Sequence, residues 1–192
     1  MRTVLATAVL AFSISAFAEI PPVPRPAKEL TIVEPSGKQS LLSQYKGKVC
    51  VIQFLFTTCP HCQKLSQELT KLQGELGPGV QMLGVAFDEA NAAKAAGYVR
   101  QFNVGFPVGF ADRTTVLNYL GLSVMDRFVV PQVMIVDRNG TVRAQSDPMG
   151  GDGKLYDPKY LSQVLGGLLK EGAAAPARPA APANKKDAKT KS

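Results

Sequence analysis

Two cysteines separated by two residues are the part of this sequence best suited to chemistry: Cys59-Pro60-His61-Cys62. The motif follows an apolar run and precedes a segment with helical periodicity, so Cys59 is expected at the N-terminus of a helix. Unpaired amide N–H groups and the helix dipole favour an anion there, which makes the reactive thiolate available at neutral pH. Cys62 lies one turn later on the same face, so the pair can open and close as a disulfide.

Other uses of the motif fit the sequence less well. A structural zinc site needs about four ligands, but His61 is the only histidine and Cys50 the only other cysteine. A haem attachment site has histidine directly after the second cysteine, where this chain has Gln63. A structural disulfide would close a very short loop and stabilise little. Dithiol redox chemistry is favoured, with His61 as a cationic or hydrogen-bonding neighbour of the thiolate, and neither a metal nor a cofactor is expected.

The elements that must position this pair alternate between strand and helix patterns. Two nearly continuous apolar runs, 49–56 and 80–87, are typical of strands buried on both faces of a parallel sheet. Further strands are expected at 30–34, 39–42, 106–110 and in a hairpin over 132–145, where Asn139-Gly140 suits a two-residue turn with positive φ. Helices are expected at about 89–102 and 113–120, after the motif with Leu65, Leu69 and Leu72 on one face, and near the end with Leu161, Leu165 and Leu168. The pattern predicts an α/β domain with a mixed central sheet and helices on both faces.

Both ends of the chain differ in composition from this domain. The first residues combine Arg2, a short apolar stretch and a small-residue cleavage pattern at 16–18, as in a secretory signal. The stretch is shorter than the roughly 20 residues that span a bilayer, which favours cleavage over a membrane anchor. We therefore expect an exported protein, periplasmic or extracytoplasmic, that is soluble after cleavage. The expected divisions are a signal peptide at 1–18, a Pro-rich lead-in at 19–28, the domain at 29–171 and a disordered Ala/Pro/Lys tail at 172–192.

Composition and charge exclude several classes of protein. With 45% apolar and 19% charged residues, the chain as a whole is neither collagen-like, disordered nor a coiled coil. The net charge of +7 at first suggests a nucleic-acid or membrane partner. However, Arg2 lies in the signal and the tail from residue 173 carries a net +4, which leaves about +2 on the folded part. No nucleic-acid partner is expected, and membrane contact is at most peripheral, through the basic tail.

The combination of motifs resembles the thioredoxin-like superfamily, in particular the exported TlpA/ResA type related to the AhpC/TSA redoxins. The resemblance covers roughly residues 26–171 and rests on 41–49 (LLSQYKGKV), 54–62 (FLFTTCPHC), 106–108 (FPV) and 130–140 (VPQVMIVDRNG). It implies a thioredoxin-like fold. In this family the proline at the start of the late strand is cis and packs beside the redox pair, a role that carries over to Pro131.

Two departures from the family pattern affect the expected chemistry. Many thioredoxins carry a buried acid six positions before the first cysteine, where this chain has Gln53, which cannot accept a proton at neutral pH. Proton transfer must then use water or another group. Asp88 and Glu89 are candidates, although solvated loop carboxylates are the favoured interpretation of both. The Pro-His dipeptide between the cysteines, with Val130 before the late proline, instead resembles the strongly oxidising DsbA proteins, which carry a larger helical insertion.

These features predict a thiol–disulfide oxidoreductase that exchanges disulfides with exported protein substrates. The expected site consists of Cys59, Cys62, His61 and Pro131, with protein thiols or disulfides as substrates and a further thiol protein as electron donor or acceptor. The direction of electron flow stays open, because the scaffold resembles reductases and the motif resembles oxidants. We expect a redox potential on the oxidising side of thioredoxin.

Other functions remain as alternatives. An AhpC/TSA-type thiol peroxidase resembles this chain, but those enzymes have Thr and Pro where Phe56 and Ile52 stand. A metallochaperone or a non-catalytic binding module on the same scaffold is the alternative from another class, although the spacing of cysteines typical of copper delivery is missing. Cys50, at the start of the strand, is expected to be a buried and inert small hydrophobe.

Overall fold

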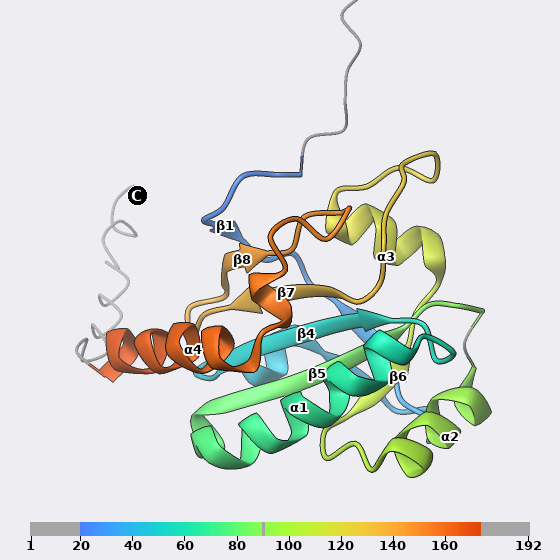
Figure 1. The fold of residues 1–192 in the computed structure, drawn as a ribbon, viewed down its shortest axis with the longest axis horizontal. Helices are drawn as coiled ribbons and strands as arrows, with labels where there is room; N and C mark the ends of the chain where they lie inside the picture. The colour runs from blue at the N-terminus through green and yellow to red at the C-terminus, as the bar shows by residue number, and fades with distance from the viewer. Residues whose placement is uncertain (1–19, 90, 174–192) are drawn as a thin grey trace, which may run out of the picture.

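A computed structural model describes residues 20–89 and 91–173, so the predicted signal peptide and nearly all of the predicted tail lie outside the described residues (Figure 1). The strands are β1 Arg25–Pro26, β2 Thr31–Val33, β3 Gln39–Leu41, β4 Val49–Leu55, β5 Val80–Ala86, β6 Val108–Phe110, β7 Gln132–Val136 and β8 Thr141–Gln145. The α-helices are α1 Pro60–Leu76, α2 Ala92–Phe102, α3 Arg113–Leu120 and α4 Pro158–Ala173, with short 3-10 turns η1 Leu42–Tyr45, η2 Gly77–Gly79 and η3 Lys154–Tyr156. Within the described residues no helix is both long and apolar enough to cross a membrane.

The strands form one mixed sheet in the order β1-β8-β7-β4-β5-β6-β2-β3. β4 pairs in parallel with β5 and antiparallel with β7, and every residue of β4 is buried. The predicted lead-in does more than extend along the surface, because Arg25–Pro26 pairs with β8 and adds an edge strand to the sheet. Because β4 is paired on both sides and buried, its carboxyl end fixes the start of the loop that carries Cys59.

Helices cover both faces of the sheet, as the sequence predicts (Figure 1). Alternate side chains of β4 divide between two cores, because successive residues of a strand point to opposite faces. Val49, Val51 and Leu55 pack with α1, α2 and α4 on one face. Cys50, Ile52 and Phe54 pack with α3 and the N-terminal strands on the other.

Most predicted boundaries are confirmed, and the differences have local causes. α2 begins at Ala92 rather than at about 89 because the Asn91 side chain caps it, accepting a hydrogen bond from the Lys94 amide at 3.0 Å. The hairpin strands have the predicted bounds, but the predicted two-residue turn is wrong. Only Gly140 in the turn has positive φ (82°), since the Asp137 carboxylate accepts bonds from the amides of Asn139 and Thr141 and fixes a longer turn.

Candidate active site

The Cys59-to-Cys62 segment lies at the junction between β4 and α1. Cys59 is the N-cap residue and Pro60 the first residue of the helix, as predicted. The Cys62 amide donates to Cys59 Sγ at 3.3 Å, so the sulfur occupies the place of a capping oxygen. Cys59 is half-buried, whereas Cys62 is fully buried, and both are free thiols. One cysteine is therefore accessible to a partner and the other only to its neighbour.

Pro131, which is distant in the sequence, lies close to Cys59 in the structure. β7 lies beside β4 with Gln132 opposite Phe54, so the residues just before β7 face those just after β4. The Val130–Pro131 peptide bond is cis, as the family resemblance implies. The Cys59 thiol donates to the Val130 carbonyl oxygen at 3.7 Å. The structure thus brings together the predicted cysteines and the loop of the predicted proline.

A buried polar chain lies beneath Cys62 in the place of the missing acid. Gln53 Nε2 donates to the Cys62 carbonyl oxygen at 2.9 Å, and Gln53 Oε1 accepts from the Ser66 hydroxyl at 2.7 Å. The Ser66 and Tyr98 hydroxyl oxygens are 2.8 Å apart. Because Ser66 has given its single proton to Gln53, Tyr98 is the donor in that last bond. Gln53 thus anchors the first turn of α1 and is hydrogen-bonded through both its amide nitrogen and its amide oxygen.

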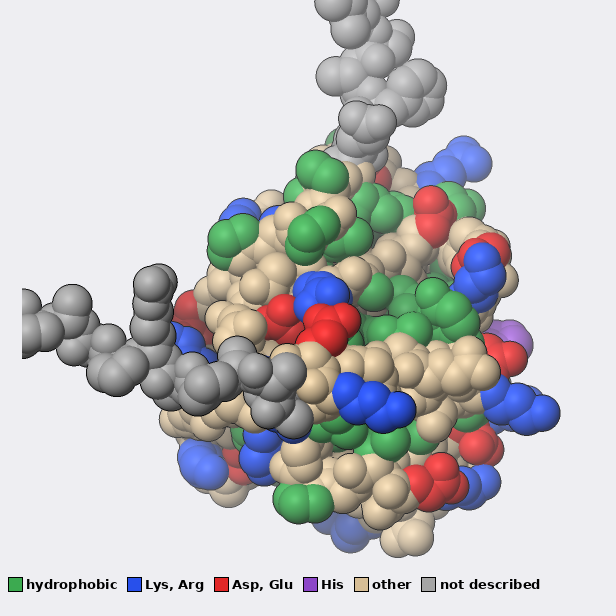
Figure 2. Space-filling view, turned by 90° about the vertical axis from the view of Figure 1, so that its left-hand side faces the viewer, with side chains coloured by type: hydrophobic (Ala, Val, Ile, Leu, Met, Phe, Trp, Pro, Cys, Tyr) green, Lys and Arg blue, Asp and Glu red, His purple; other side chains and the backbone are tan. Residues whose placement is uncertain are grey.

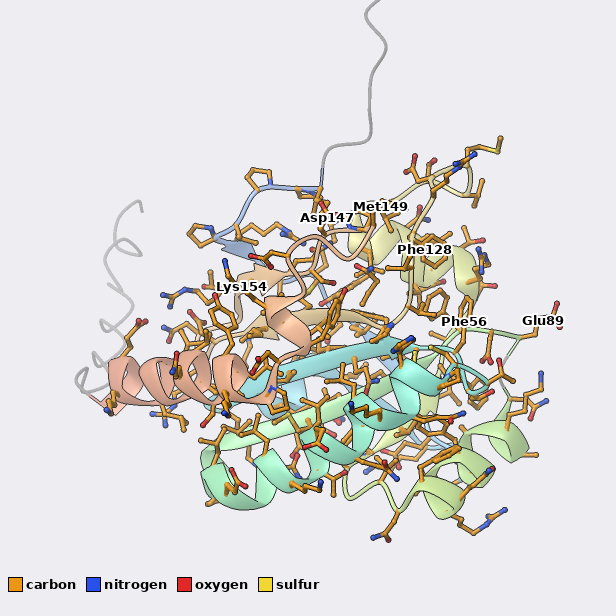
Figure 3. The ribbon with its side chains drawn as sticks, in the orientation of Figure 1. Phe56, Glu89, Phe128, Asp147, Met149 and Lys154 are labelled. Atoms are coloured by element: carbon orange, nitrogen blue, oxygen red, sulfur yellow. The ribbon has the colours of Figure 1, made fainter. Side chains whose placement is uncertain are left out.

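Asp88 holds the loop between β4 and α1. The amide and the hydroxyl of Thr57 both donate to Asp88 Oδ2, each at 2.7 Å. The interpretation of Asp88 as a solvated loop carboxylate is therefore wrong. It is half-buried, and its other oxygen, Oδ1, is buried without a hydrogen-bond partner in the described structure. Its neighbour Glu89 is exposed and points away from the domain, as expected of a solvated carboxylate (Figure 3).

A cavity of about 730 Å³ opens beside the cysteines and the Pro131 loop. It is lined by residues from three places, namely the first turns of α1, the loop before β7 and the start of α4: His61, Lys64, Leu65, Glu68, Val129, Val130, Pro131, Gly153, Tyr156, Asp157 and Pro158. His61 is exposed at its edge, close to a hydrophobic part of the surface (Figure 2). The predicted histidine thus faces this cavity and solvent.

Apolar side chains are also exposed in the loops next to the cavity. Val129 is 41% exposed, and Met149, in the loop after β8, is 59% exposed (Figure 3). The Val129 amide donates to the Pro148 carbonyl oxygen at 2.8 Å, which joins the two loops. An unbranched methionine adapts its shape to different partners, so this rim suits contact with apolar segments of varied sequence.

Sequence reasoning missed the polar pair that supports the Pro131 loop. Gln132 is 1% exposed, and its Nε2 donates to the Val129 carbonyl oxygen at 2.8 Å. Its Oε1 accepts from the Ser146 hydroxyl at 2.8 Å, and Ser146 in turn accepts from the Val133 amide at 2.9 Å. The available signal was a glutamine at the start of an otherwise apolar strand. A buried amide must be satisfied, and this one ties the two loops together.

Cys50 lies at the opposite end of β4 from the other two cysteines. It is 2% exposed, and burial raises the pKa of its thiol to about 11, with a smaller lowering effect from Lys48. The prediction that it is buried is confirmed. Its thiol is held in the protonated, unreactive form at neutral pH.

Comparison with known proteins finds relatives that are named for thiol–disulfide exchange. It is 27% identical over 120 residues to the thiol:disulfide interchange protein DsbE of Pseudomonas aeruginosa, covering 62% of each chain. It is 26% identical over 120 residues to the thiol-disulfide oxidoreductase ResA of Geobacillus thermodenitrificans, covering 61% of this chain and 64% of the relative. These matches thus span less than two thirds of the relatives' own lengths.

The fold has close counterparts among solved structures. A thiol:disulfide interchange protein of the thioredoxin family from Chlorobium tepidum superposes with a TM-score of 0.62 at 20% identity, covering 78% of this chain and 99% of that one. The fold is therefore thioredoxin-like, as expected. The AhpC/TSA family model matches residues 23–145, which include β4, the cysteine pair and the β7–β8 hairpin. The chain belongs to the AhpC/TSA family.

Proposed function

We propose that this protein is a thiol–disulfide oxidoreductase whose redox centre is the Cys59–Cys62 pair. One observation carries the proposal: Cys59 Sγ caps α1, accepting the Cys62 amide at 3.3 Å, and lies 3.7 Å from the carbonyl oxygen that precedes Pro131. Donation from an amide at a helix N-terminus stabilises a negatively charged sulfur. Similarity to DsbE and ResA proteins supports the same activity.

The unequal burial of the cysteines supports different roles for the two. Cys59, half-buried, attacks a substrate disulfide and forms a mixed disulfide, releasing one substrate thiolate. Cys62, fully buried, then attacks Cys59 Sγ, which forms the internal disulfide and releases the second thiolate. The substrate gains two electrons and the cysteine pair loses two. In the reverse direction the internal disulfide is attacked at Cys59 and the substrate dithiol is oxidised.

Pro131 and His61 take supporting roles in this proposal. The Pro131 loop lies against Cys59 and lines the cavity of about 730 Å³, so it contacts a polypeptide bound across the cysteine pair. His61, exposed at the edge of the cavity, supplies a positive charge or a hydrogen bond to the thiolates formed in each step. The mixture of apolar and oppositely charged lining residues favours protein segments over a small charged ligand as substrate.

The proposed location and partners are supported by the sequence. The predicted signal peptide supports an exported protein, periplasmic or extracytoplasmic, that acts on thiols and disulfides of exported proteins. A second thiol protein must renew the pair after each turnover. The Cys-Pro-His-Cys sequence supports a redox potential between the values of thioredoxin and DsbA, about −270 mV and about −120 mV.

A thiol peroxidase of the AhpC/TSA type is the second candidate, because the family match itself favours it. Where those peroxidases have Thr and Pro, this chain has Phe56 and Ile52. These two side chains have no hydroxyl and pack in the aromatic and aliphatic core. The structure offers no hydrogen-bond donor from these two side chains to a peroxide. We therefore place disulfide exchange first.

The test is the reduction of insulin disulfides by dithiothreitol, followed as turbidity, alongside hydrogen peroxide consumption with the same reductant. Wild-type protein should accelerate insulin reduction. With the Cys59→Ser variant, the rate should equal that of dithiothreitol alone. Rapid peroxide consumption without insulin reduction would establish the peroxidase instead. A Cys59→Ser variant with full insulin activity would disprove the assigned centre.

A further inference from the structure

Two loops that lie far apart in the sequence border the cavity beside Cys59. They are the Pro131 loop, residues 129–131, and the loop of residues 147–153 between β8 and η3, and both contribute to the cavity lining. Each carries an exposed apolar side chain, Val129 in the first loop and Met149 in the second (Figure 3). A polypeptide bound across the cavity contacts both side chains at once when the two loops are held in one arrangement.

The 147–153 loop needs a contact outside itself to hold its position. Gly150, Gly151 and Gly153 have positive φ (94°, 53° and 70°), a region of backbone conformation that favours glycine. The internal hydrogen bonds of the loop join near neighbours, such as the bond from the Gly150 amide to the Asp147 carbonyl oxygen at 2.9 Å. Such bonds shape the turns of the loop but do not fix it against the sheet.

Hydrogen bonds from the Gln132 side chain join the two loops. Gln132 Nε2 donates to the Val129 carbonyl oxygen, on one loop, at 2.8 Å. The same nitrogen donates to the carbonyl oxygens of Asp147 and Pro148, on the other loop, at 3.3 Å and 3.2 Å. The two hydrogens of one amide group thus serve both loops. The Val129 amide adds a direct bond between the loops, to the Pro148 carbonyl oxygen at 2.8 Å.

Gln132 is itself fixed by its strand and by Ser146. It is the first residue of β7 and lies opposite Phe54 of the central strand β4. Its side chain is buried, and Oε1 accepts from the Ser146 hydroxyl at 2.8 Å. An amide that is bonded at both ends has one orientation, so its donor hydrogens stay directed at the loops. The centre of the sheet therefore sets the arrangement of the loops across the cavity.

The reactivity of the Cys59 sulfur has a different origin. Cys59 Sγ accepts from the Cys62 amide at 3.3 Å, within the first turn of α1. Among the described residues, Gln132 makes no hydrogen bond to either cysteine. A small disulfide reacts with Cys59 without reaching the two loops, whereas a polypeptide disulfide also binds them. The two kinds of substrate should therefore depend on Gln132 to different degrees.

We infer that Gln132 is a positioning residue that makes the site prefer polypeptide disulfides to small disulfides, an inference that rests on the proposed function. Gln132 is buried and acts through the two loops that it joins. Because the loops are ordered before a substrate arrives, a bound polypeptide does not have to order them. Gln132 thus contributes to the binding of a polypeptide and not to the exchange reaction at Cys59.

The Gln132→Met variant tests this role, because it keeps the length of the side chain and removes its hydrogen bonds. With insulin as the polypeptide disulfide and dithiothreitol as reductant, the KM for insulin should rise roughly tenfold while kcat changes less than about threefold. Attack of the reduced protein on 5,5′-dithiobis(2-nitrobenzoate), followed as the first coloured thiolate released, should keep its rate within about threefold. Hydrogen exchange, measured by mass spectrometry, should become faster in residues 147–153.

Two further variants separate positioning from a general loss of stability. Gln132→Glu can donate to the loops only while its carboxyl group is protonated. Its KM for insulin, relative to wild type at the same pH, should therefore rise as the pH rises. Gln73→Met is the matched control, since Gln73 Oε1 accepts from the Met82 amide at 2.7 Å near the far end of α1. It should change neither the KM for insulin nor the release of the coloured thiolate.

The outcomes distinguish this inference from the proposed function. An unchanged KM for insulin in Gln132→Met, or equal losses with insulin and the small disulfide, would overturn the inference. If Gln132→Met does not fold, Ser146→Ala, which removes the donor to Gln132 Oε1, replaces it in the same comparison with an expected KM increase of about threefold. An unchanged KM in that variant would then overturn the inference. A wild-type protein that neither reduces insulin nor releases thiolate through Cys59 would instead disprove the proposed function.

Discussion

The same kind of residue lies near both ends of β4, in opposite surroundings. At its start, Cys50 is enclosed by the sheet and the N-terminal strands, 2% exposed. Beyond its end, Cys59 is half-buried, caps a helix and accepts an amide hydrogen bond. Both sulfurs are part of one strand–helix unit, so composition does not distinguish them. The position of each relative to unpaired backbone amides decides which cysteine can react.

A second contrast separates the two cysteines of the pair. Cys59 lies against the Pro131 loop, where a partner can reach it, and Cys62 is fully buried above the Gln53–Ser66–Tyr98 chain. In the proposed reaction, exposure selects Cys59 as the attacking sulfur, and burial keeps Cys62, the resolving sulfur, from reacting with outside partners. The predictions below address these contrasts, beginning with the largest expected effect.

Replacing the cysteine at each end of β4 should give opposite results for activity. Cys59→Ser removes the attacking thiolate and should lower the rate of disulfide exchange by at least roughly 10³-fold, to the uncatalysed level. Cys50→Ser, the matched variant, should keep most of the activity, because the site lies at the other end of the strand. Initial rates with insulin and dithiothreitol measure both. Equal losses in the two variants would mean that Cys59 has no special chemical role.

The Cys62→Ser variant should accumulate the intermediate that the wild type resolves. Its Cys59 can attack a substrate disulfide, but no internal thiol remains to release the product. Intact mass spectrometry after mixing with oxidised glutathione should show one glutathione per chain, bound to Cys59. Bound glutathione at Cys50 in the folded variant would contradict the assignment of that residue as unreactive.

The polar chain beneath Cys62 should contribute to stability. Gln53→Leu leaves the Cys62 carbonyl and the Ser66 hydroxyl without their partner in a fully buried place, which should cost about 1–3 kcal/mol of unfolding free energy. Gln44→Leu, at an exposed glutamine in η1 that makes one long hydrogen bond, from the Leu41 amide at 3.3 Å, serves as the comparison and should cost under about 1 kcal/mol. Urea unfolding of the two variants provides the values. A smaller loss in Gln53→Leu than in Gln44→Leu would show that the buried chain adds no net stability.

Cys50 should weaken the fold at alkaline pH. Its pKa is raised from 9.0 to about 11 in the folded protein, so its stabilising effect is complete below about pH 9 and is lost as pH rises to about 11. The loss is about 1.4 kcal/mol per pH unit over that interval. In the oxidised protein, the difference in unfolding free energy between wild type and Cys50→Ala should shift by about 2 kcal/mol in favour of the variant between pH 8 and 11. A difference that stays constant from pH 8 to 11 would contradict the buried-thiol account.

Local patterns in the sequence were sufficient to predict the α/β class with its mixed sheet and the position of the cysteine pair, whereas the thioredoxin-like fold was implied by the family resemblance. The buried strands, the helix N-terminus at Cys59 and the bounds of α3 depend on hydrophobic period and on Pro60, which are visible locally. The resemblance to a family, rather than the residues alone, indicated the cis bond before Pro131.

The supporting residues could not be predicted because they depend on contacts between distant segments. Asp88 meets Thr57 across 31 positions, and Gln132 meets Ser146 across 14. A single carboxylate after a strand has the same local pattern whether it is solvated or bonded. The lead-in strand β1 is similar, since its pairing with β8 depends on a hairpin more than a hundred residues away.

A redox titration in glutathione buffers, with free thiols alkylated and located by mass spectrometry, tests the central claim most directly. Mass detection suits this chain because it contains no tryptophan to report the change by fluorescence. The free thiols of Cys59 and Cys62 should disappear together as one internal disulfide forms, with a midpoint potential less negative than about −270 mV. Cys50 should stay an alkylatable thiol throughout. A chain in which Cys59 and Cys62 stay alkylated in every buffer, or in which Cys50 enters the disulfide, would contradict the account.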